Sequence, residues 1–170
     1  FFVKEIYQSP GSVQKTMDGK FCVTDRGVTF FLDATTLPPK ISEALQSGKI
    51  QQIYCIGQGT ASIAAQTFAH QLFMTLTGSK INVWGMKASE FSGFYLQPVM
   101  DSSLVIAVTQ SGTTTDTNRA VDMAKKRGAY TLAIVNRRNS HVTTMVDGVF
   151  YTSDGRDIEM AVASTKAFYA

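Results

Sequence analysis

Residues 103–114 read SLVIAVTQSGTT, a short apolar run that passes directly into a turn rich in hydroxyl groups. Ser103 to Val108 is largely β-branched and apolar, which predicts a buried strand of a parallel sheet. Residues 116–126 follow with one buried helical stripe, formed by Ala120, Val121, Met123 and Ala124. A turn between a strand and a helix directs free backbone N–H groups and the positive end of a helix dipole at one spot, which suits a phosphate.

The composition is that of an ordinary globular protein and argues against several classes of partner. The 170 residues are 44% hydrophobic and 17% charged, which is enough for one domain with a sizeable core. The formal net charge is +3, and the sequence has no run of five lysines and arginines, so neither nucleic acid nor a membrane surface is expected as a partner. A small anionic ligand is compatible with this charge.

The cysteines and histidines are too scattered for a metal or redox site. Cys55 lies in an apolar run and is expected to be a buried free thiol, far from Cys22. No metal and no cofactor are expected. No apolar run approaches the roughly 20 residues that cross a bilayer, and the N-terminus does not resemble a signal peptide. We therefore expect a cytoplasmic chain and, from its two ends, a piece of a longer protein.

The chain divides into an arm and an alternating region. Residues 1–36 are expected to form an N-terminal helical arm and connector, with a helix over 3–8, a break at Ser9-Pro10 and a second helix begun by Pro10. Residues 20–36 fit either a hairpin around Asp25-Arg26-Gly27 or an irregular surface connector.

From residue 37 to 170, strands and helices alternate. The expected strands are 52–56, 81–84, 103–108, 130–135 and 148–152, and the expected helices are 38–46, 62–75, 116–127, 140–146 and one from Met160 onward. This alternation predicts an α/β fold, a three-layer α/β/α sandwich with a five-stranded parallel sheet of the flavodoxin-like type. Ligands of such sheets bind beyond the carboxyl ends of the strands, where the loops 57–60 and 109–114 and the turn after the fifth strand would meet.

The loop 57–60, Gly-Gln-Gly-Thr, gives a weak indication. Its glycines permit close approach of a ligand to the backbone, and Thr60 is expected to cap the next helix. A dinucleotide fingerprint needs a third glycine and an acidic residue after the second strand, and both are missing. A plain tight turn explains the loop equally well.

The loop 109–114 is more informative, because it carries four hydroxyls and one amide where a helix cap needs one acceptor. It lacks the lysine of a P-loop, so a sugar phosphate bound without magnesium fits better than a nucleotide. Residues 162–166 also open a helix with small residues, hydroxyls and Lys166. The carboxylates Glu90, Asp157 and Glu159 are acid/base candidates, although solvent-facing roles are more common for such residues.

Three motifs resemble the sugar isomerase (SIS) domain: TQSGTTTDT at 109–117, LAIVN at 132–136 and AVASTKAF at 161–168. They are most similar to the first of two such subdomains in the glutamine–fructose-6-phosphate amidotransferase family. KEIYQ at 4–8 with Pro10, and ASEF at 88–91, also match that family. The resemblance implies that the phosphate of fructose 6-phosphate is bound by Thr109, Gln110, Ser111 and Thr114.

The same resemblance implies that Thr60, Ser164 and the backbone of Val162 and Ala163 contact the sugar, and Lys166 completes the set of substrate-binding candidates. The family commonly has Cys-Gly-Thr-Ser at 58–61 and Gln-Ser-Gly-Glu-Thr at 110–114, so Gln58, Ala61 and Thr113 are departures that bear on the choice of sugar.

The resemblance places the chemistry outside this chain. The glutamate base, the ring-opening histidine and the lysine of the isomerase would lie beyond Ala170, and the glutaminase would precede Phe1. The chain alone is therefore expected to be inactive. Two alternatives stay open: a SIS-type deglycase or isomerase without a glutaminase, and a sugar-phosphate sensor. A homodimer through SIS domains is expected, with an interface or a core role for Phe91, Phe94 and Tyr95.

Overall fold

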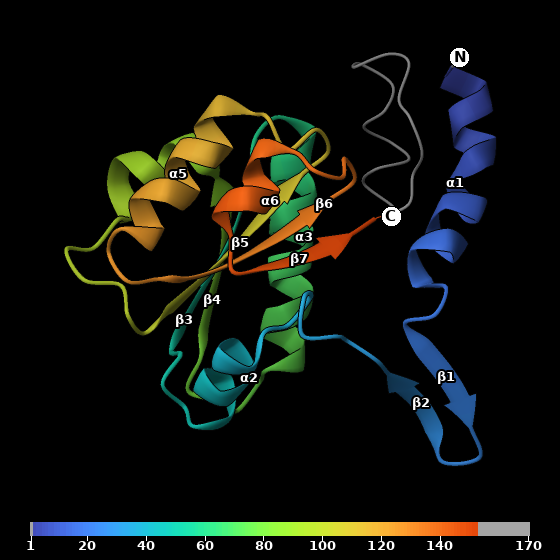
Figure 1. Cartoon of the computed structure of the whole chain (residues 1–170), viewed down its shortest axis with the longest axis horizontal. Helices are drawn as coiled ribbons and strands as arrows, with labels where there is room; N and C mark the ends of the chain where they lie inside the picture. The colour runs from blue at the N-terminus through green and yellow to red at the C-terminus, as the bar shows by residue number, and fades with distance from the viewer. Residues whose placement is uncertain (1, 153–170) are drawn as a thin grey trace.

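The strands expected from the apolar runs pair into one sheet. The computed structural model describes residues 2–152, and it contains a five-stranded parallel sheet with the order β4-β3-β5-β6-β7 (Figure 1). The strands are β3 (Gln52–Gly57), β4 (Asn82–Lys87), β5 (Ser103–Thr109), β6 (Tyr130–Val135) and β7 (Gly148–Tyr151). The predicted five-stranded sheet is confirmed.

Helices cover both faces of the sheet, which makes the three predicted layers. One face carries α2 (Pro39–Gln46) and α3 (Thr60–Thr75), whose buried residues join one core cluster. The other face carries α4 (Ala88–Glu90), the π-helical turn η1 (Phe91–Tyr95), α5 (Thr115–Lys125) and α6 (His141–Met145), which contribute to a second cluster. The α/β/α sandwich is therefore confirmed.

The central strand β5 shows why its sequence is apolar throughout. Val105 and Ala107 face the cluster beneath α5, whereas Leu104 and Ile106 face the cluster beneath α3. A strand that is covered on both faces cannot alternate between apolar and polar residues. The continuous run at 103–108 follows from this position.

The strand order fixes where a ligand would bind. β3 pairs with β4 on one side and with β5 on the other, so the chain winds in opposite directions from β3. The crevice at such a reversal, outside the carboxyl ends of the strands, is the usual ligand position in doubly wound sheets. It is bordered by the loops after β3 and β5.

Gly85 explains how α3 packs against β4. A Cβ atom at this position would lie 2.6 Å from the Gln66 Cα and 2.8 Å from the Ala69 Cβ, so only glycine permits the close contact. β4 therefore runs to Lys87 in register with β3 through Gly57. The predicted strand over 81–84 was too short, because sequence alone did not reveal that this glycine sits in a strand under a helix.

The arm consists of α1 (Phe2–Met17) followed by a hairpin of β1 (Phe21–Thr24) and β2 (Gly27–Phe30) (Figure 1). The predicted break at Ser9-Pro10 is wrong, since α1 runs through Pro10. A proline removes one helical N–H and strains the preceding turn, but the residues on either side continue the helix. Of the two readings of 20–36, the hairpin is the one observed, and Gly27 adopts a φ of 117° at its turn.

One carboxylate ties several elements together at the amino end of the sheet. Asp147 lies 2.7 Å from Lys40 Nζ of α2 and 3.2 Å from Lys125 Nζ of α5, and it accepts hydrogen bonds from the N–H and the hydroxyl of Thr131 on β6 at 2.9 and 3.0 Å. Its side chain is 8% exposed. Asp147 thus links the two helical layers through the sheet.

Within the part of the chain described, no helix has the length and apolar character needed to cross a membrane.

Candidate functional site

The turn after β5 is closed by a hydrogen bond to the side chain of Thr109, its first residue. The buried Thr109 hydroxyl accepts a hydrogen bond from the Gly112 N–H at 3.2 Å, and Gly112 has a φ of 65°. A Cβ atom at Gly112 would lie 2.0 Å from the Ser140 Oγ. The sequence needs glycine here both for the left-handed backbone and for the close contact with Ser140.

The carbonyl groups of this turn face into the protein. The Gln110 carbonyl accepts a hydrogen bond from the Arg137 N–H at 3.1 Å. The Gly112 carbonyl accepts one from the Val142 N–H at 3.0 Å and one from the Asn118 Nδ2 at 3.2 Å. In a trans peptide the N–H points away from the C=O of the same plane. The N–H groups of residues 111 and 113 therefore point away from the supporting segment 137–142.

Hydroxyl groups lie on the same outward side. The Ser111 Oγ accepts one hydrogen bond from the Thr113 N–H at 3.3 Å and one from the Thr113 Oγ1 at 3.1 Å, which places three polar groups together and leaves the Ser111 hydroxyl proton free to donate. Gln110 and Ser111 are half-buried and Thr113 is exposed. The loop thus presents hydrogen-bond donors and rotatable hydroxyls on an accessible surface, an arrangement that can bind an anion.

The amino end of α5 adds to this surface. Thr114 is the N-cap residue, yet its hydroxyl makes no capping bond, and the first bond of the helix runs from the Asn118 N–H to the Thr114 carbonyl at 3.0 Å. The N–H groups of the first helical turn therefore have no partner within the helix. They add the positive end of the helix dipole to the loop.

The loop after β3 has a comparable construction with one difference from the expectation. A Cβ atom at Gly57 would lie 2.5 Å from the Ala61 carbonyl oxygen, so the loop folds tightly over the strand end. The predicted cap by Thr60 is wrong: Gly59 is the N-cap of α3, with a φ of 59°, and Thr60 is the first helical residue. The exposed Thr60 side chain is consequently not used as a helix cap.

The sheet brings five of the nine substrate-binding candidates to one edge. β3 and β5 are neighbours, with Ile56 opposite Ala107, and adjacent strands lie about 4.8 Å apart. Their loops carry Thr60, Thr109, Gln110, Ser111 and Thr114. The other four candidates, Val162, Ala163, Ser164 and Lys166, lie outside the described residues, as do Asp157, Glu159 and the expected last helix.

Sequence reasoning missed the residues behind the loop, above all Asn118 and His141. Asn118 is 6% exposed, and its Nδ2 lies 3.2 Å from the His141 Nδ1. The sequence did contain one indication of Asn118: it is a polar residue in the buried stripe of a helix, three positions before Val121. Glu90 is exposed and lies 3.5 Å from Lys87 Nζ, in keeping with a solvent-facing role.

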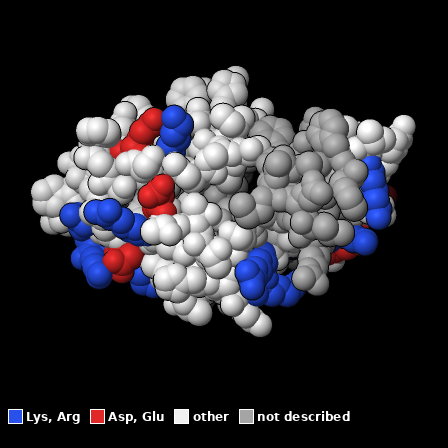
Figure 2. Space-filling view, turned by 90° about the horizontal axis from the view of Figure 1, so that it is seen from above, with Lys and Arg blue, Asp and Glu red and all other residues white. Residues whose placement is uncertain are grey.

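Cys55 is a free cysteine buried in the sandwich. Burial raises the pKa of the Cys55 thiol to about 12, so the expected buried free thiol is confirmed. No group of three or more potential ligands for a metal ion occurs in this range. On the face shown in Figure 2, Lys and Arg form small groups with Asp and Glu among them, separated by uncharged surface.

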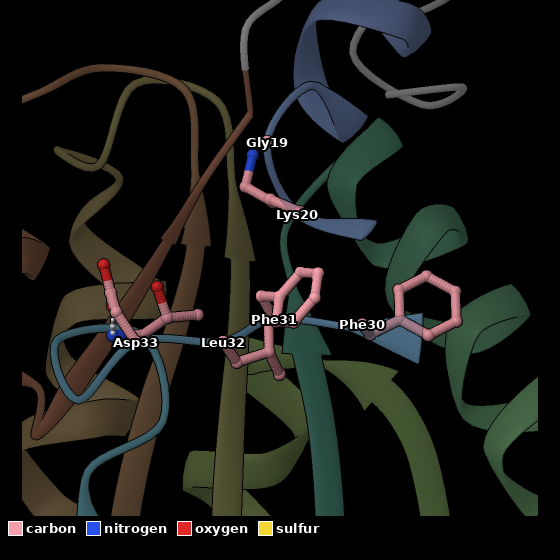
Figure 3. Close-up of a pocket in the computed structure, with 7 residues that line it drawn as sticks. Gly19, Lys20, Phe30, Phe31, Leu32 and Asp33 are labelled. Atoms are coloured by element: carbon pink, nitrogen blue, oxygen red, sulfur yellow. Dashed lines mark hydrogen bonds between the residues drawn. The ribbon is translucent and has the colours of Figure 1, made fainter. Parts of the chain in front are cut away.

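A separate hollow of about 440 Å³ lies between the hairpin and the connector that follows it (Figure 3). Its lining includes Lys20, Phe30, Phe31 and Leu32. Burial, followed by the charge of Arg138, lowers the pKa of Lys20. This lining mixes apolar side chains with Lys20, Asp33 and Thr36 and includes none of residues 109–114, so this hollow is separate from the candidate site at the loop edge.

The loop geometry, the strand order and the residues of this edge agree with the result of comparison with known families. Residues 48–170 match the family described as the SIS domain. The chain belongs to the SIS domain family. The predicted resemblance is thereby confirmed. The matched range begins before β3 and so includes all five strands of the sheet.

Curated relatives of this SIS domain share one name. A glutamine–fructose-6-phosphate aminotransferase (isomerizing) of Thermus thermophilus is 33% identical over 171 residues, and that of Fusobacterium nucleatum is 38% identical over 170 residues. These alignments cover 100% and 99% of the chain but only 25% of each relative. The chain thus spans about a quarter of the length of these relatives.

Solved structures confirm the fold. The C-terminal domain of glucosamine-fructose-6-phosphate aminotransferase from Francisella tularensis superposes with a TM-score of 0.70 at 24% identity, covering 99% of this chain and 44% of that one. The Vibrio vulnificus NanR protein complexed with ManNAc-6P gives a TM-score of 0.62 at 19% identity, covering 98% of this chain and 57% of that one. Both likenesses establish the SIS architecture.

Proposed function

We propose that this SIS domain is the sugar-phosphate-binding subdomain of a glucosamine-6-phosphate synthase-like enzyme. The full enzyme would transfer the amide nitrogen of glutamine to fructose 6-phosphate and isomerise the product to glucosamine 6-phosphate. The observation that carries the proposal is the loop 109–114 at the carboxyl end of β5, whose Gln110 and Gly112 carbonyls are held inward while the Ser111 N–H and the hydroxyls of Ser111 and Thr113 lie on the opposite side. The name shared by the curated relatives supports the choice of substrate.

Each candidate has a role in this proposal. Gln110, Ser111 and Thr114 would donate hydrogen bonds to the phosphate oxygens, and Thr109 would hold the turn through the Gly112 N–H while its own proton stays free to donate. Thr60 would contact the sugar from the neighbouring loop. Val162, Ala163, Ser164 and Lys166 would form the third side of the pocket. No residue of this chain is assigned the proton transfers, so the chain alone would bind without turnover.

Isothermal titration tests the phosphate site directly. Fructose 6-phosphate and glucosamine 6-phosphate should bind, whereas free fructose should bind at least tenfold more weakly, because only the phosphate reaches the loop. Ser111→Ala should weaken binding of both phosphorylated sugars by about 1 kcal/mol, the value of one hydrogen bond. Ser47→Ala, at the end of α2 and the amino edge of the sheet, is the matched control. Equal binding of fructose and fructose 6-phosphate would refute the site.

The proposal extends to assembly and location. We infer a homodimer through SIS domains, which light scattering of the chain checks, with a monomer as the contrary result. The two free cysteines favour a reducing cytoplasm.

ManNAc-6P bound to NanR supports a phosphorylated sugar as the class of ligand. The alternative deglycase and sensor functions stay predictions.

A further inference from the structure

We propose that Asn118 is a positioning residue of the phosphate-binding loop, and that His141 supports the orientation of its side-chain amide. This inference rests on the proposed function, because it concerns how the loop 109–114 is held in its binding shape. Neither residue touches the outward surface of the loop through any contact that the structure shows. Both act from behind it, through the Gly112 carbonyl.

The Gly112 carbonyl is the point at which the loop is held. It accepts the Val142 N–H at 3.0 Å and the Asn118 Nδ2 at 3.2 Å, so both of its lone pairs have a donor. The same peptide plane carries the Thr113 N–H on its opposite side. That N–H donates to the Ser111 Oγ at 3.3 Å, so rotation of this plane would release the Ser111 hydroxyl, and two donors to the carbonyl resist such rotation better than one.

The Gly112 carbonyl decides which end of the Asn118 amide faces the loop, and His141 matches that choice. An amide nitrogen only donates, so the His141 Nδ1 at 3.2 Å must accept, and the ring proton then lies on Nε2. Two acceptors, the Gly112 carbonyl and the His141 Nδ1, therefore face the nitrogen of Asn118. A flipped amide would bring its oxygen against the Gly112 carbonyl, which cannot donate, and His141 supports the observed orientation by presenting an unprotonated Nδ1 to the amide nitrogen.

The amide is not what packing alone would select at this position. Asn118 lies in the buried stripe of α5 with Ala120, Val121 and Ala124, and its Oδ1 is buried without a hydrogen-bond partner among the described residues. An apolar side chain would fill the stripe and leave no unpaired oxygen. An uncompensated polar group in a core is expected where function, and not stability, selects the residue.

The test compares phosphate affinity with stability in Asn118→Leu, a change of similar size that adds no charge. Inorganic phosphate and fructose 6-phosphate are titrated by NMR, following the amides of Ser111 and Thr113. The variant should bind both ligands about fivefold more weakly while its melting temperature stays the same or rises. A merely structural role would lower the melting temperature instead. Asn82→Leu, at an exposed position on β4, is the matched control.

His141 allows the same test without a change in the core, because its side chain is exposed. His141→Ala should weaken phosphate binding two- to threefold, and the double variant with Asn118→Leu should bind no more weakly than Asn118→Leu alone, since His141 acts through Asn118. His70→Ala, on the exposed face of α3, is the control. Unchanged binding in Asn118→Leu and His141→Ala would overturn this inference alone. Failure of the unchanged chain to bind phosphate would overturn the proposed function with it.

Discussion

Gly112 meets two demands that a side chain could not meet together. Its φ of 65° lies in the left-handed region, which costs other residues about 1 kcal/mol. Its missing Cβ leaves room for the Ser140 side chain, which is 4% exposed and has buried Val142 beside it. The close fit between the turn and the segment behind it therefore depends on this one atom being absent.

We expect Gly112→Ala to lower the free energy of unfolding by about 2–4 kcal/mol, since backbone strain and overpacking against Ser140 add. Urea denaturation measures the change. Gly93→Ala in η1 is the matched control, because a Cβ there would meet nothing within 4 Å. A loss below 1 kcal/mol for Gly112→Ala would show that Ser140 moves aside freely.

At this scale the sequence predicted the outward half of the site better than the inward half. Ser111 and Thr114 stand in a motif whose hydroxyls exceed what a turn needs, so the sequence alone identified them as candidates. Asn118 and His141 were not, because they are 23 residues apart and meet only through the packing of α5 against α6. A contact between helices has no local pattern.

Asp147 shows how a single carboxylate joins elements on opposite faces of the sheet. Burial raises the pKa of the Asp147 carboxyl, but hydrogen bonds from Lys40 and Thr131 and the bond and charge of Lys125 outweigh burial, so its pKa lies below the ordinary value. The ionised form is thus favoured in the folded chain. This makes the linkage of α2, β6 and α5 dependent on pH.

The direction of that dependence follows from the lowered pKa. The unfolded carboxyl has a pKa of about 3.9, so the contribution of Asp147 is complete well above this pH and is lost as the pH falls through it toward the lower folded value. Asp147→Asn should cost about 1–3 kcal/mol at pH 7 and much less at pH 3. Urea denaturation at both pH values checks this, with Asp122→Asn, in an exposed ion pair with Lys126, as control. An equal cost at both pH values would contradict it.

Element by element, local patterns succeeded where one residue type dominates. The bounds of β6 were predicted from its apolar run, and the end of α2 from Gly48, which has a φ of 72°. Gly128, with a φ of 91°, follows α5, but this helix ends at Lys125, two residues before the predicted end. The continuation of α1 through Pro10 was not predicted. Proline disfavours a helix locally, but the helical residues on both sides of Pro10 outweigh that cost. Tertiary packing also set the extent of β4.

The whole molecule is a sandwich with an arm that leaves most of its apolar residues exposed. Val23, Val28 and Phe30 of the hairpin are 73%, 55% and 62% exposed. The connection back to the sandwich begins before residue 37, since the Val149 N–H of β7 donates to the Thr35 carbonyl at 2.9 Å. The predicted division at residue 36 stays a prediction, but this bond assigns the last residues of the connector to the sheet edge.

Removal of residues 1–31 should therefore leave the sandwich folded and able to bind fructose 6-phosphate within about twofold of the intact chain. The deleted residues include the exposed hairpin and none of the loop candidates. A second deletion, of residues 1–37, should unfold at a lower temperature, because it also removes the partner of the Val149 N–H. Calorimetry and titration of both deletions check this, and loss of binding in the shorter deletion would show that the arm supports the site.

The segment behind the loop 109–114 supplies two of its hydrogen bonds from main-chain atoms, at Arg137 and Val142. Every residue type except proline has the same main-chain N–H donor. The identity of the residues in this segment therefore matters little, whereas the number of residues between the two donors matters a great deal. Arg137→Ala should bind fructose 6-phosphate like the unchanged chain, whereas one glycine inserted after Arg138 should weaken binding at least tenfold by shifting the two donors out of step. A graft of the loop into another scaffold would therefore have to include residues 137–142 at their native spacing.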